Sequence, residues 1–183
     1  MNMDPFFVWV ESTALSQWIV GSPSMFAFPG ILTVHAIGMG FAVGLSILLD
    51  LRVLGVAPGI PLQELRRFMP VLWLAFWMNA ASGLLLLIGY PTKALTNPLF
   101  YLKLLLIGTG MALLAHMSRR IWPSFVQAPE GTREPLPLDD RSRADASPDL
   151  RRLAVISLVC WTAAITAGRL LAYTYTRLTA TID

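Results

Sequence analysis

The fold of this chain is decided by an apolar stretch at residues 24–49, SMFAFPGILTVHAIGMGFAVGLSILL, which contains no Asp, Glu, Lys or Arg. A helix needs about 20 residues to cross the hydrocarbon core of a bilayer, so this stretch is long enough. Three further apolar stretches follow at residues 71–90, 99–117 and 153–175. The pattern predicts an all-α fold, a polytopic membrane four-helix bundle that forms a single membrane domain over residues 1–183.

The composition indicates a membrane protein and argues against a nucleic-acid-binding one. Of the 183 residues 55% are hydrophobic and only 14% are charged, which is too apolar for an ordinary soluble domain. The formal net charge is +3, but the basic residues lie next to the ends of the spans and show no pattern that would read a groove. We therefore expect the lipid bilayer as the main partner and no nucleic acid. Cys160, within the fourth span, is interpreted as a packing residue.

Arginine gathers in the loops on one side of the predicted bundle. If the first span runs from outside to inside, ten of the 14 Lys and Arg residues lie in inner loops: Arg52, Arg66, Arg67, Arg119, Arg120, Arg133, Arg141, Arg143, Arg151 and Arg152. Cytoplasmic loops carry an excess of Lys and Arg, so the sequence predicts both termini on the periplasmic side. The expected topology anchors at the inner surface are Asp50, Arg52, Arg66, Arg67, Arg119 and Arg120. Arg52 is expected at the headgroups, and Asp50 is expected to turn inward to Arg66, Arg67 or Arg119.

Two segments outside the spans have patterns of their own. In residues 5–20 apolar side chains mostly recur every three or four positions between polar ones, which predicts an amphipathic helix lying in the membrane interface. Residues 123–149 are rich in Pro, Asp, Arg and Ser and cannot bury enough apolar surface to offset the entropy of ordering. They are predicted to form a mobile cytoplasmic loop, either a plain linker or a docking segment for a partner.

Three stretches carry a resemblance to a known family: HAIGMGFAVGLSILLDLRVLG at residues 35–55, TNPLFYLKL at residues 96–104 and AGRLLAY at residues 167–173. Together they resemble a family of small bacterial inner-membrane proteins with four predicted spans and no assigned activity. The resemblance covers almost the whole chain. It implies the location in the inner membrane and the architecture, including the short helix before the first span, and it brings no catalytic residues.

The only two histidines, His35 in the first span and His116 in the third, raise the possibility of a haem held between two helices. At ~1.5 Å per residue, His35 lies roughly 22 Å above Asp50, whereas His116 lies about 5 Å above Arg119. Both references mark the inner surface, so the two rings differ in depth by on the order of 15 Å. Axial nitrogens of one iron lie within about 4 Å of each other. A haem b held by this pair is therefore disfavoured, and the cofactor stays open.

The other polar residues of the spans predict a site in the outer half of the bundle. An ionisable group near the membrane interior is costly and normally faces the bundle or a wet cavity, which makes His35 a candidate. Lys103 and Arg169 each lie about one turn from the outer end of a span and would make this cavity electropositive. The remaining candidates are lining residues, a counter-ion and rim donors: Asn79, Ser82, Glu11, Tyr101 and Tyr173. Such a cavity suits an anionic or carbonyl-bearing ligand, for example haem propionates, a quinone head group or a lipid phosphate.

Three simpler interpretations of these residues stay open. Lys103 and Arg169 would then snorkel to the outer headgroups. Glu11 and Arg169 would form a purely structural ion pair. His35 would be hydrogen-bonded to a neighbouring helix for structure alone. Gly40 and Gly44, four residues apart on an adjoining face, would let another helix approach closely.

The chain lacks the familiar catalytic sequence signatures, such as a phosphate-binding glycine loop, HExxH or a serine elbow. An enzyme acting by itself is not expected. The sequence instead predicts a non-catalytic membrane subunit or small-ligand-binding bundle with a polar outward-facing cavity, working with a membrane or periplasmic protein partner. The alternative is an electron-transfer membrane subunit that carries haem b, with His35 as ligand, or contacts quinone.

Overall fold

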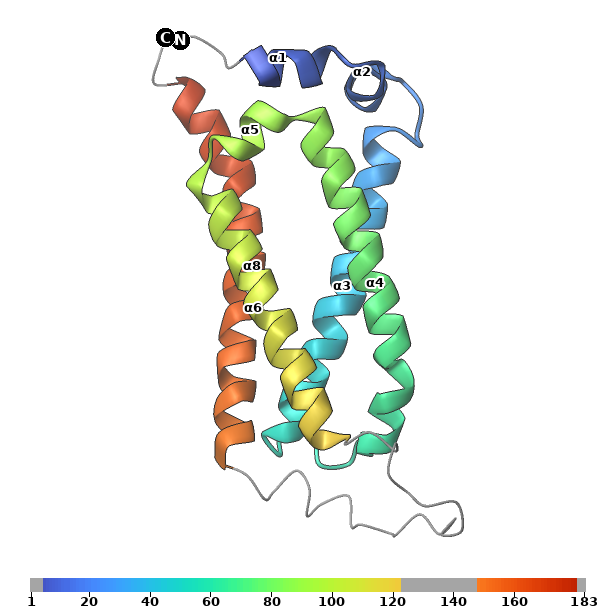
Figure 1. Cartoon of the computed structure of the whole chain (residues 1–183), viewed down its shortest axis with the longest axis vertical. Helices are drawn as coiled ribbons and strands as arrows, with labels where there is room; N and C mark the ends of the chain where they lie inside the picture. Colours follow the sequence, from blue (N-terminus) through green and yellow to red (C-terminus); the bar gives the residue numbers. More distant parts are fainter. Residues whose placement is uncertain (1–4, 123–147, 181–183) are drawn as a thin grey trace.

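A computed structural model describes residues 5–122 and 148–180, and the regular structure of these residues is entirely α-helical. Four of the helices are long and apolar enough to cross a membrane. They are α3 (Phe28–Val53), α4 (Leu62–Gly89), α6 (Pro98–Ile121) and α8 (Pro148–Ala180). Figure 1 shows them running side by side along the long axis of the molecule. The predicted all-α four-helix membrane bundle is confirmed.

The helices extend beyond the apolar stretches that predict them. α4 begins at Leu62, so Glu64, Arg66 and Arg67 lie in its first turns, and α8 begins at Pro148 rather than at residue 153. Hydropathy detects only the part of a helix that suits hydrocarbon, whereas the backbone hydrogen bonds continue into the headgroup region. α3 begins later than predicted, at Phe28, because Met25–Ala27 form a turn before it.

The four spans form two helix pairs that meet mainly along one side. α3 packs against α4 and α6 packs against α8, whereas the two pairs are joined chiefly by contacts between α3 and α8. α4 and α6 make few direct contacts, and Figure 1 shows them diverging toward the end of the bundle that α5 covers. The buried apolar core includes Leu49, Leu65, Leu114 and Met117. The bundle is therefore tightly packed on one side and open on another.

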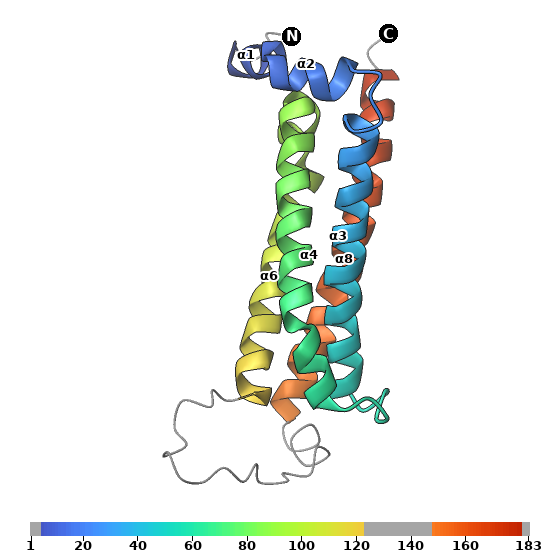
Figure 2. The same cartoon turned by 90° about the vertical axis from the view of Figure 1, so that its right-hand side faces the viewer.

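Three short helices close one end of the bundle, which we call the α1–α2 end. α1 (Pro5–Ser12) and α2 (Ala14–Gly21) lie across the spans, as Figure 2 shows, and α5 (Pro91–Leu95) lies between α4 and α6. The single interfacial helix predicted over residues 5–20 is thus two helices. Thr13 separates them, because its side chain donates to Val10 O at 2.7 Å and accepts from Ser16 N at 3.3 Å as the N-cap of α2. α5 is not predicted from the sequence.

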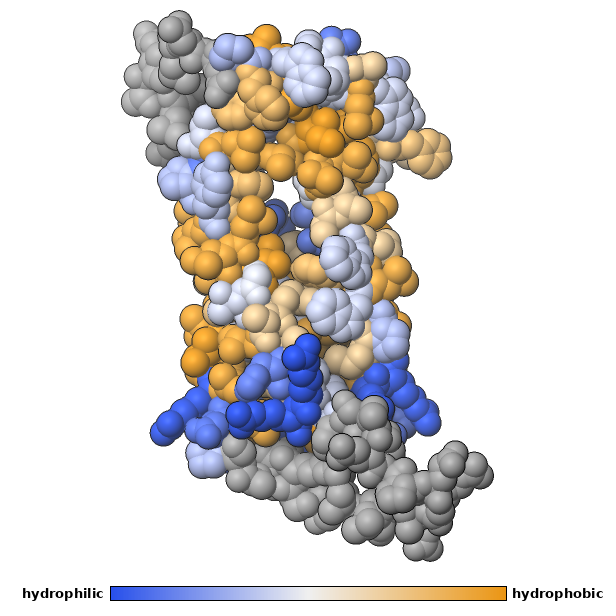
Figure 3. All heavy atoms as spheres, viewed as in Figure 1, coloured by the Kyte–Doolittle hydropathy of each residue, from blue (hydrophilic) through white to orange (hydrophobic). Residues whose placement is uncertain are grey.

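The opposite end carries most of the arginines of the spans and is called the arginine-rich end. It includes Arg66, Arg67, Arg119, Arg120, Arg151 and Arg152, and Figure 3 shows the hydrophilic surface gathered there. The turn after α3 contains Gly55 with φ +81°, a conformation that favours glycine. Residues 123–147 of the predicted mobile loop lie outside the described residues. Its last two positions, Pro148 and Asp149, belong instead to the first turn of α8.

Candidate functional site

The site begins where α3 and α4 approach most closely, at Gly38. A Cβ atom on Gly38 would lie 2.9 Å from Ala75 O and 2.9 Å from Asn79 N, so only glycine fits there. The close approach predicted for Gly40 and Gly44 is wrong, because nothing lies within 4 Å of a Cβ at either position. The glycine that admits the neighbouring helix is therefore the one on the same face as His35.

His35 is held by α4 through one ring nitrogen. Its Nδ1 lies 3.0 Å from Asn79 O and 3.2 Å from Ser82 Oγ, and the Asn79 side-chain amide donates to His35 O at 2.7 Å. The Ser82 hydroxyl donates to Met78 O at 2.7 Å, so toward His35 it acts as an acceptor. The Asn79 amide nitrogen also lies 3.3 Å from Nδ1, but its shorter bond goes to His35 O. Nδ1 of the neutral ring is therefore assigned the proton, which it donates to Asn79 O. The other nitrogen, Nε2, then keeps its lone pair for a further partner.

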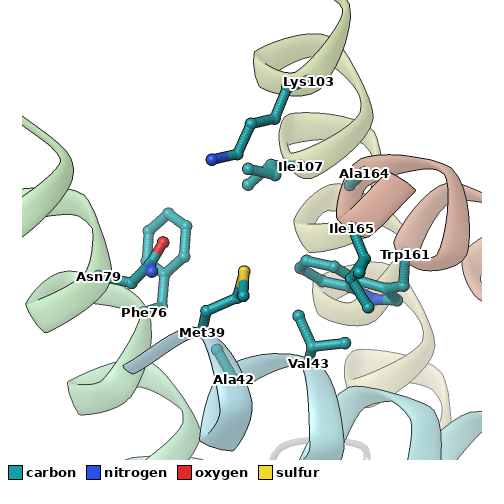
Figure 4. Close-up of a pocket in the computed structure, with 10 residues that line it drawn as sticks. All are labelled: Met39, Ala42, Val43, Phe76, Asn79, Lys103, Ile107, Trp161, Ala164 and Ile165. Carbon is teal, nitrogen blue, oxygen red and sulfur yellow. The ribbon is translucent and has the colours of Figure 1, made fainter. Parts of the chain in front are cut away.

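Lys103 extends from α6 toward the same region. Its side chain crosses α8 at Gly168, where a Cβ would lie 3.7 Å from both Cε and Nζ of Lys103. Figure 4 shows the ammonium group pointing into the space between the helices, on the side where the Asn79 amide lies. It is also near enough to His35 for the two charges to interact. Within the described part of the chain, the ammonium makes no hydrogen bond or ion pair.

A cavity lies between the four spans beside these groups. The cavity volume is about 20 Å³, room for roughly one water molecule, and it lies within about 350 Å³ of interatomic space that includes the open mouth. Its polar lining comes from Asn79 and Lys103, and the rest is apolar and aromatic: Met39, Ala42, Val43, Phe76, Ile107, Trp161, Ala164 and Ile165. Figure 3 shows a hollow between α4 and α6 with hydrophilic atoms inside it. The site is thus one cation and one amide in an otherwise apolar recess that opens sideways.

Two of the predicted site residues lie elsewhere. Arg169 is exposed on α8 and does not line the cavity. Glu11 accepts a hydrogen bond from Thr92 Oγ1 of α5 at 2.7 Å. Among the described residues no ion pair joins Glu11 to Arg169, so neither the counter-ion nor the structural pair proposed for them is formed. Of the rim donors, Tyr101 donates to Leu95 O at 2.9 Å, and Tyr173 is exposed.

The second histidine does not join the first. His116 is exposed in the last turns of α6, three residues before Arg119. It lies thirteen residues from Lys103 on α6, which is roughly 20 Å along the helix axis. The structure therefore groups His35 with Asn79, Ser82 and Lys103, and it leaves His116 outside this group.

The expected anchors at the arginine-rich end differ in their surroundings. Arg67 pairs with Glu64 at 3.3 Å on the surface, and Arg119 and Arg120 are exposed. Arg52 is buried, not at the headgroups, because the turn after α3 folds back and Ile60 O accepts from its Nε at 2.6 Å. The predicted pairing of Asp50 with Arg66, Arg67 or Arg119 is also wrong, since neither carboxyl oxygen has a hydrogen-bond partner.

Two polar residues of α8 were not among the sequence candidates. Ser157 and Trp161 are both buried, and neither the Ser157 hydroxyl nor the Trp161 indole nitrogen has a hydrogen-bond partner among the described residues. Their spacing of four residues places them on one face of a helix, which is the one signal the sequence offers.

Comparisons of the whole chain give no relative from which a function could be transferred. No family model, no curated protein and no solved structure matches it. The site itself is therefore the basis for assigning a function.

Proposed function

We propose that this protein is a non-catalytic ligand-binding bundle of the bacterial inner membrane that holds an anionic or carbonyl-bearing head group beside Lys103. The observation that carries the proposal is the Lys103 ammonium, which points into an apolar cavity and makes no hydrogen bond or ion pair within the described chain. A buried cation away from water is costly unless it is paired. A ligand oxygen would supply the missing partner.

The residues around Lys103 indicate which class of ligand the cavity suits. The Asn79 side-chain oxygen offers an acceptor in the cavity, whereas Phe76 and Trp161 form aromatic walls. The hollow between α4 and α6 opens on the side of the bundle, at the depth of the apolar stretches. A ligand that dissolves in the bilayer and carries its polar atoms at one end suits this opening, because it can enter without crossing water.

The alternative function is an electron-transfer membrane subunit that carries haem b or contacts quinone. The aromatic side chains of Phe76 and Trp161 favour quinone. A quinone ring at the mouth of the cavity would pack against aromatic side chains, and its carbonyl oxygen would accept from Lys103. For haem b, Nε2 of His35 is the nitrogen that would serve as ligand, because Nδ1 faces α4. An absorbance spectrum with a reduced-minus-oxidised α band that disappears in His35→Ala would establish the haem form.

The test measures binding of two defined probes to the full chain in detergent by native mass spectrometry, namely phosphatidylglycerol and a short-chain ubiquinone analogue. We expect one of them to bind wild type, and Lys103→Met to weaken that binding about 10-fold or more, since a charge-assisted hydrogen bond contributes about 1.5–3 kcal/mol. Lys93→Met is the matched control, because Lys93 lies over the Tyr90 ring at the α1–α2 end. Equal binding by wild type and Lys103→Met, or no binding of either probe, would overturn the proposal.

The orientation proposed with this function places the arginine-rich end in the cytoplasm and both termini in the periplasm. It is supported by the basic residues gathered at one end of the spans, which exceed those near the other end, and by the tendency of cytoplasmic loops to carry Lys and Arg. The cavity then lies in the periplasmic half. Phosphatase and fluorescent-protein fusions after residue 141 and at the C-terminus test it. A periplasmic signal from the fusion at residue 141 would reverse the assignment.

A further inference from the structure

A second group of buried polar atoms lies between α3 and α8, nearer the arginine-rich end than the cavity is. Asp50 and Ser157 are each 0% exposed and Trp161 is 2% exposed. Within residues 5–122 and 148–180, no hydrogen-bond partner is found for either carboxyl oxygen of Asp50, the Ser157 hydroxyl or the Trp161 indole nitrogen. The Ser157 hydroxyl lies close enough to Asp50 to interact with its carboxyl group. Four polar atoms on two facing helices are thus buried together without the partners that protein interiors normally provide.

An unpaired carboxylate in such a place is far more costly than a neutral carboxylic acid. The carboxyl group therefore needs either a positive partner or a proton. Among the described residues, the ionisable side chains near this end are Arg52 of α3, Glu64, Arg66 and Arg67 of α4, His116, Arg119 and Arg120 of α6, and Asp149, Arg151, Arg152 and Cys160 of α8. None of them donates a hydrogen bond to Asp50. Arg52, which is buried nearby, directs its Nε to Ile60 O instead.

We infer that Asp50 is a proton-binding site of the bundle, with Ser157 beside it as the hydroxyl that contacts the protonated acid. One proton from water adds to a carboxylate oxygen, and the same proton returns to water when the group ionises. A proton is favoured over a metal ion because the described residues contain no group of three or more His, Cys, Asp or Glu that could hold one. A sodium ion would also need several oxygen ligands, whereas a proton needs a single lone pair.

This site is separate from the Lys103 cavity but adjoins it through Trp161. The indole ring lines the cavity, and Ser157 lies one turn along α8 from it. The inference does not rest on the proposed ligand, because it depends only on Asp50 and its unpartnered neighbours.

Infrared absorption of the full chain in dodecyl maltoside, a detergent without a carbonyl group, tests the inference. We expect a carboxylic-acid C=O band in wild type at neutral pH that shifts in heavy water and disappears as the pH is raised, while carboxylate absorption grows. Asp50→Asn, which keeps the shape of the side chain, should remove this band. Asp149→Asn is the matched control, because Asp149 is an exposed acid of α8, and it should leave the band unchanged.

Two further measurements keep the test decisive. Ser157→Ala should retain the band and shift its frequency, since it removes the hydroxyl beside the acid, and wild type alone should show the band even if Asp50→Asn fails to fold. Absence of a protonated carboxyl in folded wild type at neutral pH would overturn the inference. Loss of the band on adding sodium at constant pH would also overturn it, because a sodium ion would then be the occupant.

Discussion

The polar groups at the α3–α4 contact and at the α3–α8 contact differ in their hydrogen bonding. Between α3 and α4, His35 Nδ1, the Asn79 amide and the Ser82 hydroxyl all have partners on the two helices. Between α3 and α8, the side-chain polar atoms of Asp50, Ser157 and Trp161 have no hydrogen-bond partner in the part of the chain that the structure describes. Both contacts lie inside one bundle, so the difference comes from the partners that the neighbouring helix supplies and not from burial alone.

The comparison distinguishes polar groups that stabilise the fold from polar groups that are available to bind a ligand or a proton. Hydrogen bonds between spans contribute modestly to stability, and a group that is fully paired has little capacity left for a ligand or a proton. A buried polar group without a hydrogen-bond partner lowers the stability of the fold. Its presence therefore needs an explanation other than folding. On this argument Nδ1 of His35 positions the ring, whereas Lys103 and Asp50 are the groups available for function.

Gly38→Ala should have the largest effect, because it breaks the α3–α4 contact at its closest point. The new Cβ would meet backbone atoms of α4 at 2.9 Å, and backbone cannot move aside as a side chain can. We expect a loss of about 3 kcal/mol in the free energy of unfolding, the upper end of the usual range for overpacking. Unfolding by dodecyl sulfate, followed by circular dichroism, measures it. Gly40→Ala is the matched control, since a Cβ there meets nothing within 4 Å; similar losses in both variants would disprove the close contact.

Gly110→Ala should have a smaller effect, and it shows how the α6–α8 contact responds. A Cβ on Gly110 would lie 2.9 Å from Trp161 Cε2, so the indole ring must shift. Because a side chain can adjust where backbone cannot, we expect about 1–2 kcal/mol. Gly108→Ala, on the same helix with nothing within 4 Å, should be neutral or slightly stabilising. A loss in Gly110→Ala as large as that of Gly38→Ala would mean that the two sides are equally rigid.

Asn79→Ala removes one of the satisfied bonds across the α3–α4 contact. The bond from the Asn79 amide to His35 O measures 2.7 Å, and a bond between spans is worth about 0.6 kcal/mol on average. We expect a loss of about 1 kcal/mol by the same unfolding assay, because His35 O also loses its side-chain donor. Thr33→Ala, whose hydroxyl bonds only within α3 to Pro29 O, is the control. No difference between the two variants would argue that the bond across the helices adds no stability.

The sequence predicts the number and order of the membrane-spanning helices, because the length of an apolar stretch can be read directly from the residues. It also predicts that His35, Asn79 and Lys103 share a depth in the membrane. It does not predict α5 or the division between α1 and α2. It fails for Arg169, because depth does not fix the direction in which a side chain points. Successive residues of a helix differ by about 100° in direction, so Gly168 meets Lys103 while Arg169 is exposed. Asp50 and Arg52 are misassigned for a related reason, since only the folded turn brings Ile60 O to Arg52.

Thr92→Val should have the smallest effect, and it tests how α1 is attached to the bundle. Thr92 Oγ1 donates to Glu11 at 2.7 Å, and this bond joins α1 to α5 at the partly exposed α1–α2 end. Because water can replace the lost donor for Glu11, we expect a global loss of a few tenths of a kcal/mol, about 0.5 at most. Hydrogen exchange should nevertheless rise in residues 5–12 and stay unchanged in α3. Ser12→Ala removes a hydroxyl that bonds only within α1, to Trp9 O, and serves as the control. If Thr92→Val left exchange in α1 unchanged, the attachment would depend on the other contacts of α1 with α4 and α5, and the Glu11 bond would be incidental.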